Sequence, residues 1–193
     1  IINSKDDNIQ MEGDNVNIRI WGNILTTNNG YANIAMAPHL AGPVYIFRNV
    51  MKHSWSGGSG YTFKLESSPG YAFYMHNSVD TTGSSQNHDG WSGGTKPYQF
   101  LYNNIIKTSG YPHSGLSSTG AVNGNVYHKP SGGVIINNWN GGTDYSSITA
   151  FRTATGQEQN GVQADPLYTD TALHINSNSP AVNNGTIIPN FND

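Results

Sequence analysis

Five short stretches of the chain follow one pattern, and each of them contains an asparagine at the same place. They are IRIWGNIL (Ile18–Leu25), VYIFRNVM (Val44–Met51), AFYMHNSV (Ala72–Val79), QFLYNNII (Gln99–Ile106) and AVNGNVY (Ala121–Tyr127). The shared asparagines stand at positions 23, 49, 77, 104 and 125, so the intervals between them are 26, 28, 27 and 21 residues. A strand-like unit that recurs at such intervals is typical of a solenoid, in which successive units stack on one another.

Each unit reads as two short strands joined by a turn. In the first unit Ile18 and Ile20 alternate with Arg19 and Trp21, and this period of two is that of a β-strand with one apolar face. Asn23 then marks the turn, and a second short strand follows it. A unit of this size cannot bury its apolar face alone, so parallel stacking is expected to give each unit a neighbour above and below.

The recurring asparagine has a physical role in such a stack. Asparagine tolerates the left-handed αL backbone conformation, and its amide can form hydrogen bonds with the asparagine of the next rung. A ladder of identical side chains would stabilise flat, stacked strands. The alternative is an asparagine-rich antiparallel sandwich. Because sandwiches do not repeat a whole pattern at this interval, the sequence favours the solenoid.

The composition argues against several classes of protein. Only 11% of the 193 residues are charged, against about 25% in an average domain, and the net charge is −3. The chain has no run of basic residues, so a nucleic-acid partner is not expected. No apolar stretch approaches the roughly 20 residues of a membrane-spanning helix. Because the chain has no cysteine, disulfides and thiolate metal sites are excluded.

A further strand precedes each of the first three units. The segments Asn8–Glu12, Asn33–Ala37 and Thr62–Glu66 align residue for residue, and the apolar residues at their second and fourth positions are expected to face the core. We predict one domain, in which residues 1–142 form the rungs and residues 143–193 form the last rung and a C-terminal cap. Since residue 1 falls in the middle of a repeat, the rungs are expected to continue into an N-terminal part that precedes this sequence.

These repeats resemble those of right-handed parallel β-helix proteins of the pectate-lyase-like superfamily. The block DDNIQMEG (Asp6–Gly13), with the strands that follow it, resembles a recurring block in secreted bacterial β-helix proteins. The stretch from Ser146 to Pro166, together with Ser179–Ala181, resembles their usual C-terminal ending. The resemblance implies an all-β fold, a right-handed parallel β-helix that is a single-stranded solenoid with an irregular C-terminal capping tail. It also implies a secreted or cell-surface location and a polysaccharide partner.

The outward residues of the three aligned strands predict a binding face for an extended polymer. Glu12 and Glu66 stand at matching positions on the first and third strands, so their backbones are expected to lie roughly 9.6 Å apart. Ala35 and Ala37 on the middle strand are small. A trough flanked by acids and by Lys64 is therefore expected above the middle strand.

This face permits two mechanisms. In a glycoside hydrolase, Glu12 and Glu66 would act as acid and base with inversion of configuration, with Asp7 nearby. In a lyase, Lys64 would abstract the proton next to a uronic-acid carboxylate, and His39, which borders the same trough, would be the substitute base. The scarcity of lysine and arginine counts slightly against a highly anionic polymer.

The remaining candidates are contacts to a cation or to sugar. No cofactor is required, but Asp6 and Asp7 form the densest acidic cluster, which would suit a hard cation such as Ca²⁺ and would equally suit a solvated turn. Arg48, His76 and Asn103, which directly precede turn asparagines, read as surface decoration without a function. Substrate contacts are expected from polar residues of the face and from side chains beside it, namely Gln10, Asn33, His88, Trp91, Trp55 and Tyr61.

The sequence therefore predicts a secreted, carbohydrate-active β-helix protein that binds and cleaves an extended polysaccharide. A polysaccharide lyase is slightly favoured, and an inverting glycoside hydrolase on the same scaffold is the first alternative. The second alternative is a non-catalytic surface-binding or structural β-helix, such as an adhesin or spike segment. The superfamily contains lyases, hydrolases, epimerases and adhesins, so the resemblance leaves this choice open.

Overall fold

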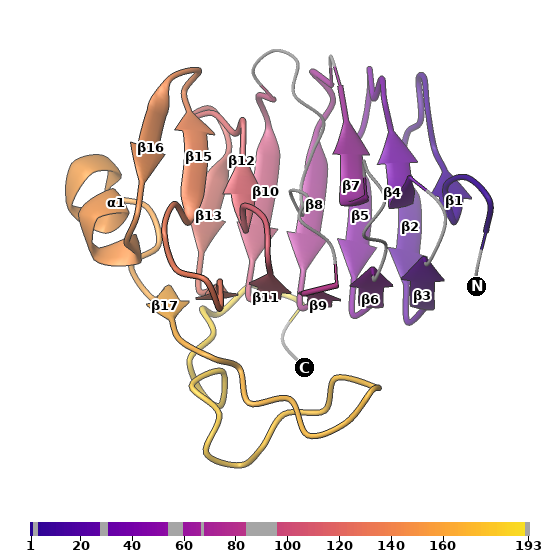
Figure 1. Ribbon diagram of the computed structural model, residues 1–193. Coiled ribbons are helices and arrows are strands. Elements are labelled where there is room, and N and C mark those ends of the chain that lie inside the picture. The colour runs from indigo at the N-terminus through magenta and orange to yellow at the C-terminus, as the bar shows by residue number, and fades with distance from the viewer. Residues whose placement is uncertain (2–3, 28–30, 54–59, 67, 84–95, 192–193) are drawn as a thin grey trace.

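The computed structural model describes residue 1 and residues 4–27, 31–53, 60–66, 68–83 and 96–191 (Figure 1). They form a parallel β-solenoid with one short helix near the C-terminal end of the stack. Strands that hold the same place in successive rungs lie side by side, so that three parallel sheets run along the solenoid. This is the right-handed parallel β-helix that the sequence predicts.

Within each of these sheets, every strand comes from a different rung. The first sheet contains β1 (Ile9–Gln10), β4 (Ala32–Met36) and β7 (Tyr61–Leu65). The second contains β2 (Ile18–Trp21), β5 (Val44–Phe47), β8 (Ala72–Met75), β10 (Gln99–Tyr102) and β13 (Ala121–Asn123). The third contains β3 (Ile24–Thr27), β6 (Val50–His53), β9 (Ser78–Thr81), β11 (Ile105–Thr108), β14 (Val126–His128) and β17 (Val162–Gln163).

A fourth, smaller sheet lies toward the C-terminal end of the stack. It contains β12 (His113–Ser114), β15 (Ile136–Trp139) and β16 (Thr143–Tyr145). β12 pairs with β15 in parallel, whereas β15 and β16 form an antiparallel pair. Because β16 runs antiparallel to β15, it ends this fourth sheet, whereas β17 adds one more parallel strand to the third sheet.

The predicted register of the first sheet is confirmed. Ile9 pairs with Ile34, and Ile34 pairs with Phe63 in the next rung. Ile34 is 0% exposed and Phe63 is 3% exposed, so these apolar side chains face the core as expected. The alternation of the strands thereby places Gln10 and Lys64 on the outer face.

The predicted asparagine ladder is also confirmed, and it forms a continuous row inside the turn between the second and third sheets. The Nδ2 atoms of Asn23, Asn49, Asn77 and Asn104 each donate to the Oδ1 atom of the next asparagine, at 3.0, 3.0, 2.9 and 2.9 Å. Each of these Oδ1 atoms also accepts the backbone N–H of the asparagine below. The last member of the row is Asn125. The ladder therefore joins each rung to the next through buried polar groups.

The left-handed conformation belongs to the residue before each asparagine, so the expectation that the asparagine itself would adopt it is wrong. Gly22, Arg48, His76, Asn103 and Gly124 have φ angles of 65°, 53°, 54°, 57° and 72°. The physical reason is that the turn must be completed one residue earlier. The asparagine can then point its amide inward, in line with its neighbours in the stack.

The helix α1 (Ile148–Thr155) covers the end of the stack. Ser147 caps its N-terminus, with the Ser147 Oγ atom accepting the backbone N–H of Ala150 at 3.1 Å, and Gly156 ends it with a φ angle of 73°. Phe151 is 0% exposed and packs edge-on against Trp139, with ring centroids 4.8 Å apart. The helix therefore closes the apolar core at this end.

Glu158 closes the asparagine ladder at the same end. Its Oε1 atom accepts hydrogen bonds from Asn125 Nδ2 at 2.6 Å and from the Tyr127 hydroxyl at 2.7 Å, and its Oε2 atom accepts the Asn125 N–H at 3.3 Å. Glu158 is 0% exposed, and burial raises the pKa of its carboxyl group, against the opposing effect of these hydrogen bonds. The last ladder amide therefore has an acceptor although no further asparagine follows.

After β17 the chain runs back along the solenoid as an irregular tail (Figure 1). The Tyr168 hydroxyl oxygen lies 3.3 Å from the Val79 carbonyl oxygen and 3.4 Å from that of Ile105, and Lys52 Nζ donates to the Thr171 carbonyl at 3.0 Å. The tail thus crosses several rungs of the third sheet. Among the described residues, no helix is both long and apolar enough to cross a membrane.

Candidate functional site

The outer face of the first sheet places three of the predicted residues in line. Gln10, Ala35 and Lys64 occupy matching positions on β1, β4 and β7. Glu12 and Glu66, which follow these strands, are both exposed to solvent. Both carboxylates are therefore accessible to solvent, and their joint action on a substrate stays a prediction.

Lys64 does not border an open trough, because its ammonium group forms an ion pair with Asp7. Lys64 Nζ lies 3.4 Å from Asp7 Oδ2, and the Asp7 side chain is completely shielded from solvent. Lys64 belongs to the third rung and Asp7 precedes the first, so the pair spans the middle rung. Ala35 is 0% exposed. The prediction of an open trough above Ala35 is wrong, because a long lysine side chain crosses the space that a small residue leaves.

The ion pair also bears on the Asp6–Asp7 cluster. Burial raises the pKa of the Asp7 carboxyl group, and the positive charge of Lys64 opposes this effect. Asp6 is exposed, whereas the inaccessible Asp7 carboxylate already has a cationic neighbour. A Ca²⁺ ion at this place would have to displace Lys64, so the residues do not form a prepared cation site. Within the described part of the chain, no three His, Cys, Asp or Glu side chains are grouped to hold a metal.

The His39 and Asn33 side chains are buried, which contradicts their expected place on the surface of the face. His39 is 0% exposed and its Nε2 atom lies 3.2 Å from the Tyr71 carbonyl oxygen, while its ring packs where a side chain on Gly70 would be. Burial lowers the pKa of the His39 imidazole. Asn33 is also 0% exposed, and its Oδ1 atom accepts a hydrogen bond from Asn8 at 3.0 Å. These side chains serve the interior of the stack and are out of reach of a polymer on the surface.

Tyr61, which the sequence predicts as a substrate contact, is largely buried. Tyr61 is 9% exposed, whereas Tyr31, in the rung before it, is 43% exposed. The Tyr31 ring centroid lies 5.9 Å from Lys64 Nζ, so this exposed ring stands beside the ion pair. The remaining predicted contacts, Trp55, His88 and Trp91, lie outside the described residues.

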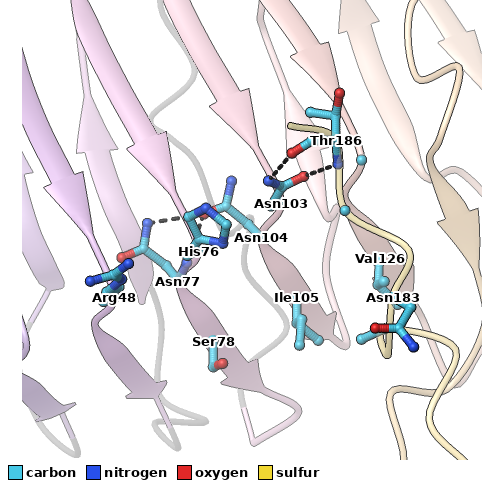
Figure 2. A pocket seen from close by; sticks show the side chains of 13 residues that line it. Arg48, His76, Asn77, Ser78, Asn103, Asn104, Ile105, Val126, Asn183 and Thr186 are labelled. Atoms are coloured by element: carbon cyan, nitrogen blue, oxygen red, sulfur yellow. Dashed lines mark hydrogen bonds between the residues drawn. The ribbon is translucent and has the colours of Figure 1, made fainter. Parts of the chain in front are cut away.

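A hollow of about 630 Å³ lies elsewhere, between the turn that joins the second and third sheets and the C-terminal tail. Figure 2 shows Arg48, His76 and Asn103 in a row at the ends of successive strands, with Thr186 of the tail opposite. The Asn103 Nδ2 atom donates to the Thr186 carbonyl at 2.8 Å, and its Oδ1 atom accepts the Thr186 N–H at 2.7 Å. The tail is thus held over the row of left-handed residues.

From the sequence, Arg48, His76 and Asn103 are expected to be surface decoration, whereas the structure places them at the edge of this hollow. The available signal was the row itself, since a polar or charged residue precedes three successive ladder asparagines where glycine suits the backbone better. The sequence does not indicate that the C-terminal tail covers this row, because Thr186 is 83 positions away from Asn103 in the sequence.

No protein-family model, curated protein or solved structure matches this chain.

Proposed function

We propose that this protein binds an extended polysaccharide along the outer face of the first sheet and hydrolyses it with inversion of configuration. The observation that carries the proposal is the pair of exposed carboxylates, Glu12 and Glu66, on either side of the middle rung. Stacked strands lie about 4.8 Å apart, so two rungs separate the backbones of this pair by roughly 9.6 Å. Inverting hydrolases hold their two carboxyl groups about 6.5–9.5 Å apart, which leaves room for a water molecule.

The surroundings of the pair suit a sugar polymer. Gln10 is exposed and offers an amide that can both donate and accept hydrogen bonds. Tyr31 is exposed and offers an aromatic ring for stacking on a pyranose. Straight parallel strands repeat these contacts along one direction, as an extended polymer requires. One carboxyl would protonate the glycosidic oxygen while the other, ionised, activates the water.

The ion pair favours hydrolysis over the lyase reaction that the sequence slightly favoured. A lyase base must accept a proton from the carbon next to the uronic-acid carboxylate. Lys64 lies against the Asp7 carboxylate as an ammonium donor, which has no lone pair to accept that proton. His39, the substitute base, is buried. Of the catalytic candidates among the described residues, the two glutamates are therefore the accessible acid–base groups.

The test is incubation with a panel of neutral and uronic-acid polysaccharides, with both new reducing ends and absorbance at 232 nm followed over time. We expect reducing ends without the absorbance of unsaturated products. Glu12→Gln and Glu66→Gln should each lower the rate about 100-fold or more, and Asp14→Asn, which neutralises an exposed acid of the same rung, should leave it unchanged. A rise at 232 nm would instead establish a lyase.

A second candidate is binding without cleavage, which the closed surface above Ala35 favours. In this second candidate, the Lys64–Asp7 ion pair only stabilises the fold, and Glu12 and Glu66 are solvated side chains without a catalytic role. In this case polysaccharides would retard the protein in affinity electrophoresis, Tyr31→Ala would abolish the retardation, and no reducing ends would appear with any polymer of the panel.

A further inference from the structure

The hollow beneath the C-terminal tail has the charge of an anion-binding site. Arg48 and His76 lie on its edge, and none of its described lining residues carries an acidic side chain. Arg48 is exposed, so its guanidinium group is available to a ligand. A guanidinium group binds a carboxylate through two parallel hydrogen bonds, and this geometry makes arginine selective for planar anions.

The tail positions the Arg48 and His76 side chains. The Arg48 guanidinium carbon lies 5.5 Å from the centroid of the Phe191 ring, and Arg48 Nη2 donates to the Phe191 carbonyl at 3.4 Å. The His76 ring stacks on the same phenylalanine, with ring centroids 5.4 Å apart and planes inclined by 10°. Phe191 therefore holds both groups side by side, which lowers the entropy cost of binding a ligand between them.

The rest of the hollow offers contacts that suit a sugar ring. Ile105, at the start of β11, provides an apolar surface, and Ser78 of β9 and Asn183 of the tail provide polar groups (Figure 2). A pyranose has apolar C–H faces and polar hydroxyl edges, so it needs both kinds of surface. A volume of about 630 Å³ is within the range of sites that bind small molecules.

We infer that this hollow is a separate saccharide site that binds the carboxylate of a sugar acid, with Arg48 as the principal contact and His76 beside it. The site lies between the second and third sheets, whereas the glutamate pair lies on the first. It therefore does not depend on the proposed hydrolysis. It would hold a uronic-acid unit irrespective of whether the other face cleaves the polymer.

The test is a titration of the ¹⁵N-labelled protein, followed by NMR, with two probes that differ only in the carboxylate: methyl β-D-glucuronide and methyl β-D-glucoside. We expect saturable shifts with the glucuronide at Arg48 Nε, at the Asn103 side-chain amide and at the Gly124 and Gly185 amides, and no saturable shifts with the glucoside. Arg48→Gln should weaken glucuronide binding at least 10-fold, and Arg48→Lys should restore only part of it because lysine lacks the planar fork.

Arg19→Gln is the matched control. Arg19 lies on β2 with its guanidinium over the Tyr45 ring, so this change alters the net charge equally without touching the hollow. The Arg19→Gln variant should bind the glucuronide as tightly as the unaltered protein does. The Glu12→Gln and Glu66→Gln variants should do the same. Unchanged spectra outside the hollow would show that Arg48→Gln is folded.

Three results would overturn the inference. The first is equal binding of glucuronide and glucoside, which would remove the role of the carboxylate. The second is acetate binding as tightly as the glucuronide, which would remove the role of the sugar ring. The third is an unchanged affinity in a folded Arg48→Gln variant.

Discussion

At the scale of the residue, Asn77 shows why one side-chain type recurs in this chain. It is 1% exposed, and its amide donates to the Ile46 carbonyl at 2.9 Å and to Asn104 Oδ1 at 2.9 Å. Its own Oδ1 atom accepts both the backbone N–H and the side-chain amide of Asn49. Asparagine is small and combines two amide donors with an acceptor oxygen, so one side chain satisfies buried groups of both neighbouring rungs.

We therefore expect Asn77→Ala to lower the free energy of unfolding by about 3 kcal/mol, because it leaves several buried polar groups without partners. Urea denaturation followed by circular dichroism measures the change. Asn178→Ala, at an exposed position of the tail, is the matched control and should change the free energy by less than about 0.5 kcal/mol. Equal effects of the two substitutions would contradict a stabilising role of the ladder.

The residue that ends the ladder predicts a pH dependence. Burial raises the pKa of Glu158 above its ordinary value of 4.5, so the folded protein holds this proton to a higher pH than the unfolded chain does. The contribution of Glu158 to stability is complete below pH 4.5 and is lost as the pH rises through the raised pKa. The free energy of unfolding, measured by urea denaturation across this range, should fall with rising pH, and Glu158→Gln should flatten that fall. An identical slope in the variant would show that other groups cause it.

At the scale of the element, stacked aromatic rings hold the outer face of the second sheet together. The Phe73 ring stacks on Tyr45 of the previous rung, with centroids 5.4 Å apart, and on Phe100 of the next, with centroids 4.7 Å apart. Parallel strands in register place like side chains directly above one another, so the ring faces cover each other.

We expect Phe73→Leu to lower the free energy of unfolding by about 1–2 kcal/mol, since each aromatic pair contributes about 0.5–1.5 kcal/mol beyond the area it buries. The measurement is a double-mutant cycle with Tyr45→Leu in chemical denaturation. A coupling energy near zero between the two substitutions would mean that the rings stabilise the sheet independently and not through their stacking.

Elements whose position follows from periodicity could be predicted from the sequence, and contacts between distant side chains could not. Alternation and the asparagine intervals were sufficient to align Ile9, Ile34 and Phe63, because a parallel stack repeats one register. The sequence did not predict that the Lys64 side chain extends over Ala35, since this depends on the ion pair that a flexible lysine forms with Asp7. His39 was misplaced for a related reason, because its burial depends on the absence of a side chain at Gly70.

At the scale of the whole molecule, a solenoid gains its stability from contacts between neighbouring rungs, so its ends decide where unfolding starts. At the C-terminal end, Phe151 of α1 is fully buried against Trp139 and Tyr145. Arg152 holds the same helix to the following loop, since its guanidinium donates to the carbonyl groups of Glu158 and Gly161. The cap thus protects both the apolar core and the end of the asparagine ladder.

We expect Phe151→Ala to cost about 3–5 kcal/mol and to expose the last rungs before the central ones. Hydrogen exchange followed by mass spectrometry should show early loss of protection in β14 and β15, while β5 and β8 stay protected for longer. Phe151→Leu keeps most of the buried volume, so it should lose less hydrogen-exchange protection, and again first in β14 and β15. Because each rung contacts only its neighbours, the effect should decline with distance from the cap. Simultaneous loss of protection in all rungs would show instead that the solenoid unfolds as one cooperative unit, with no frayed end.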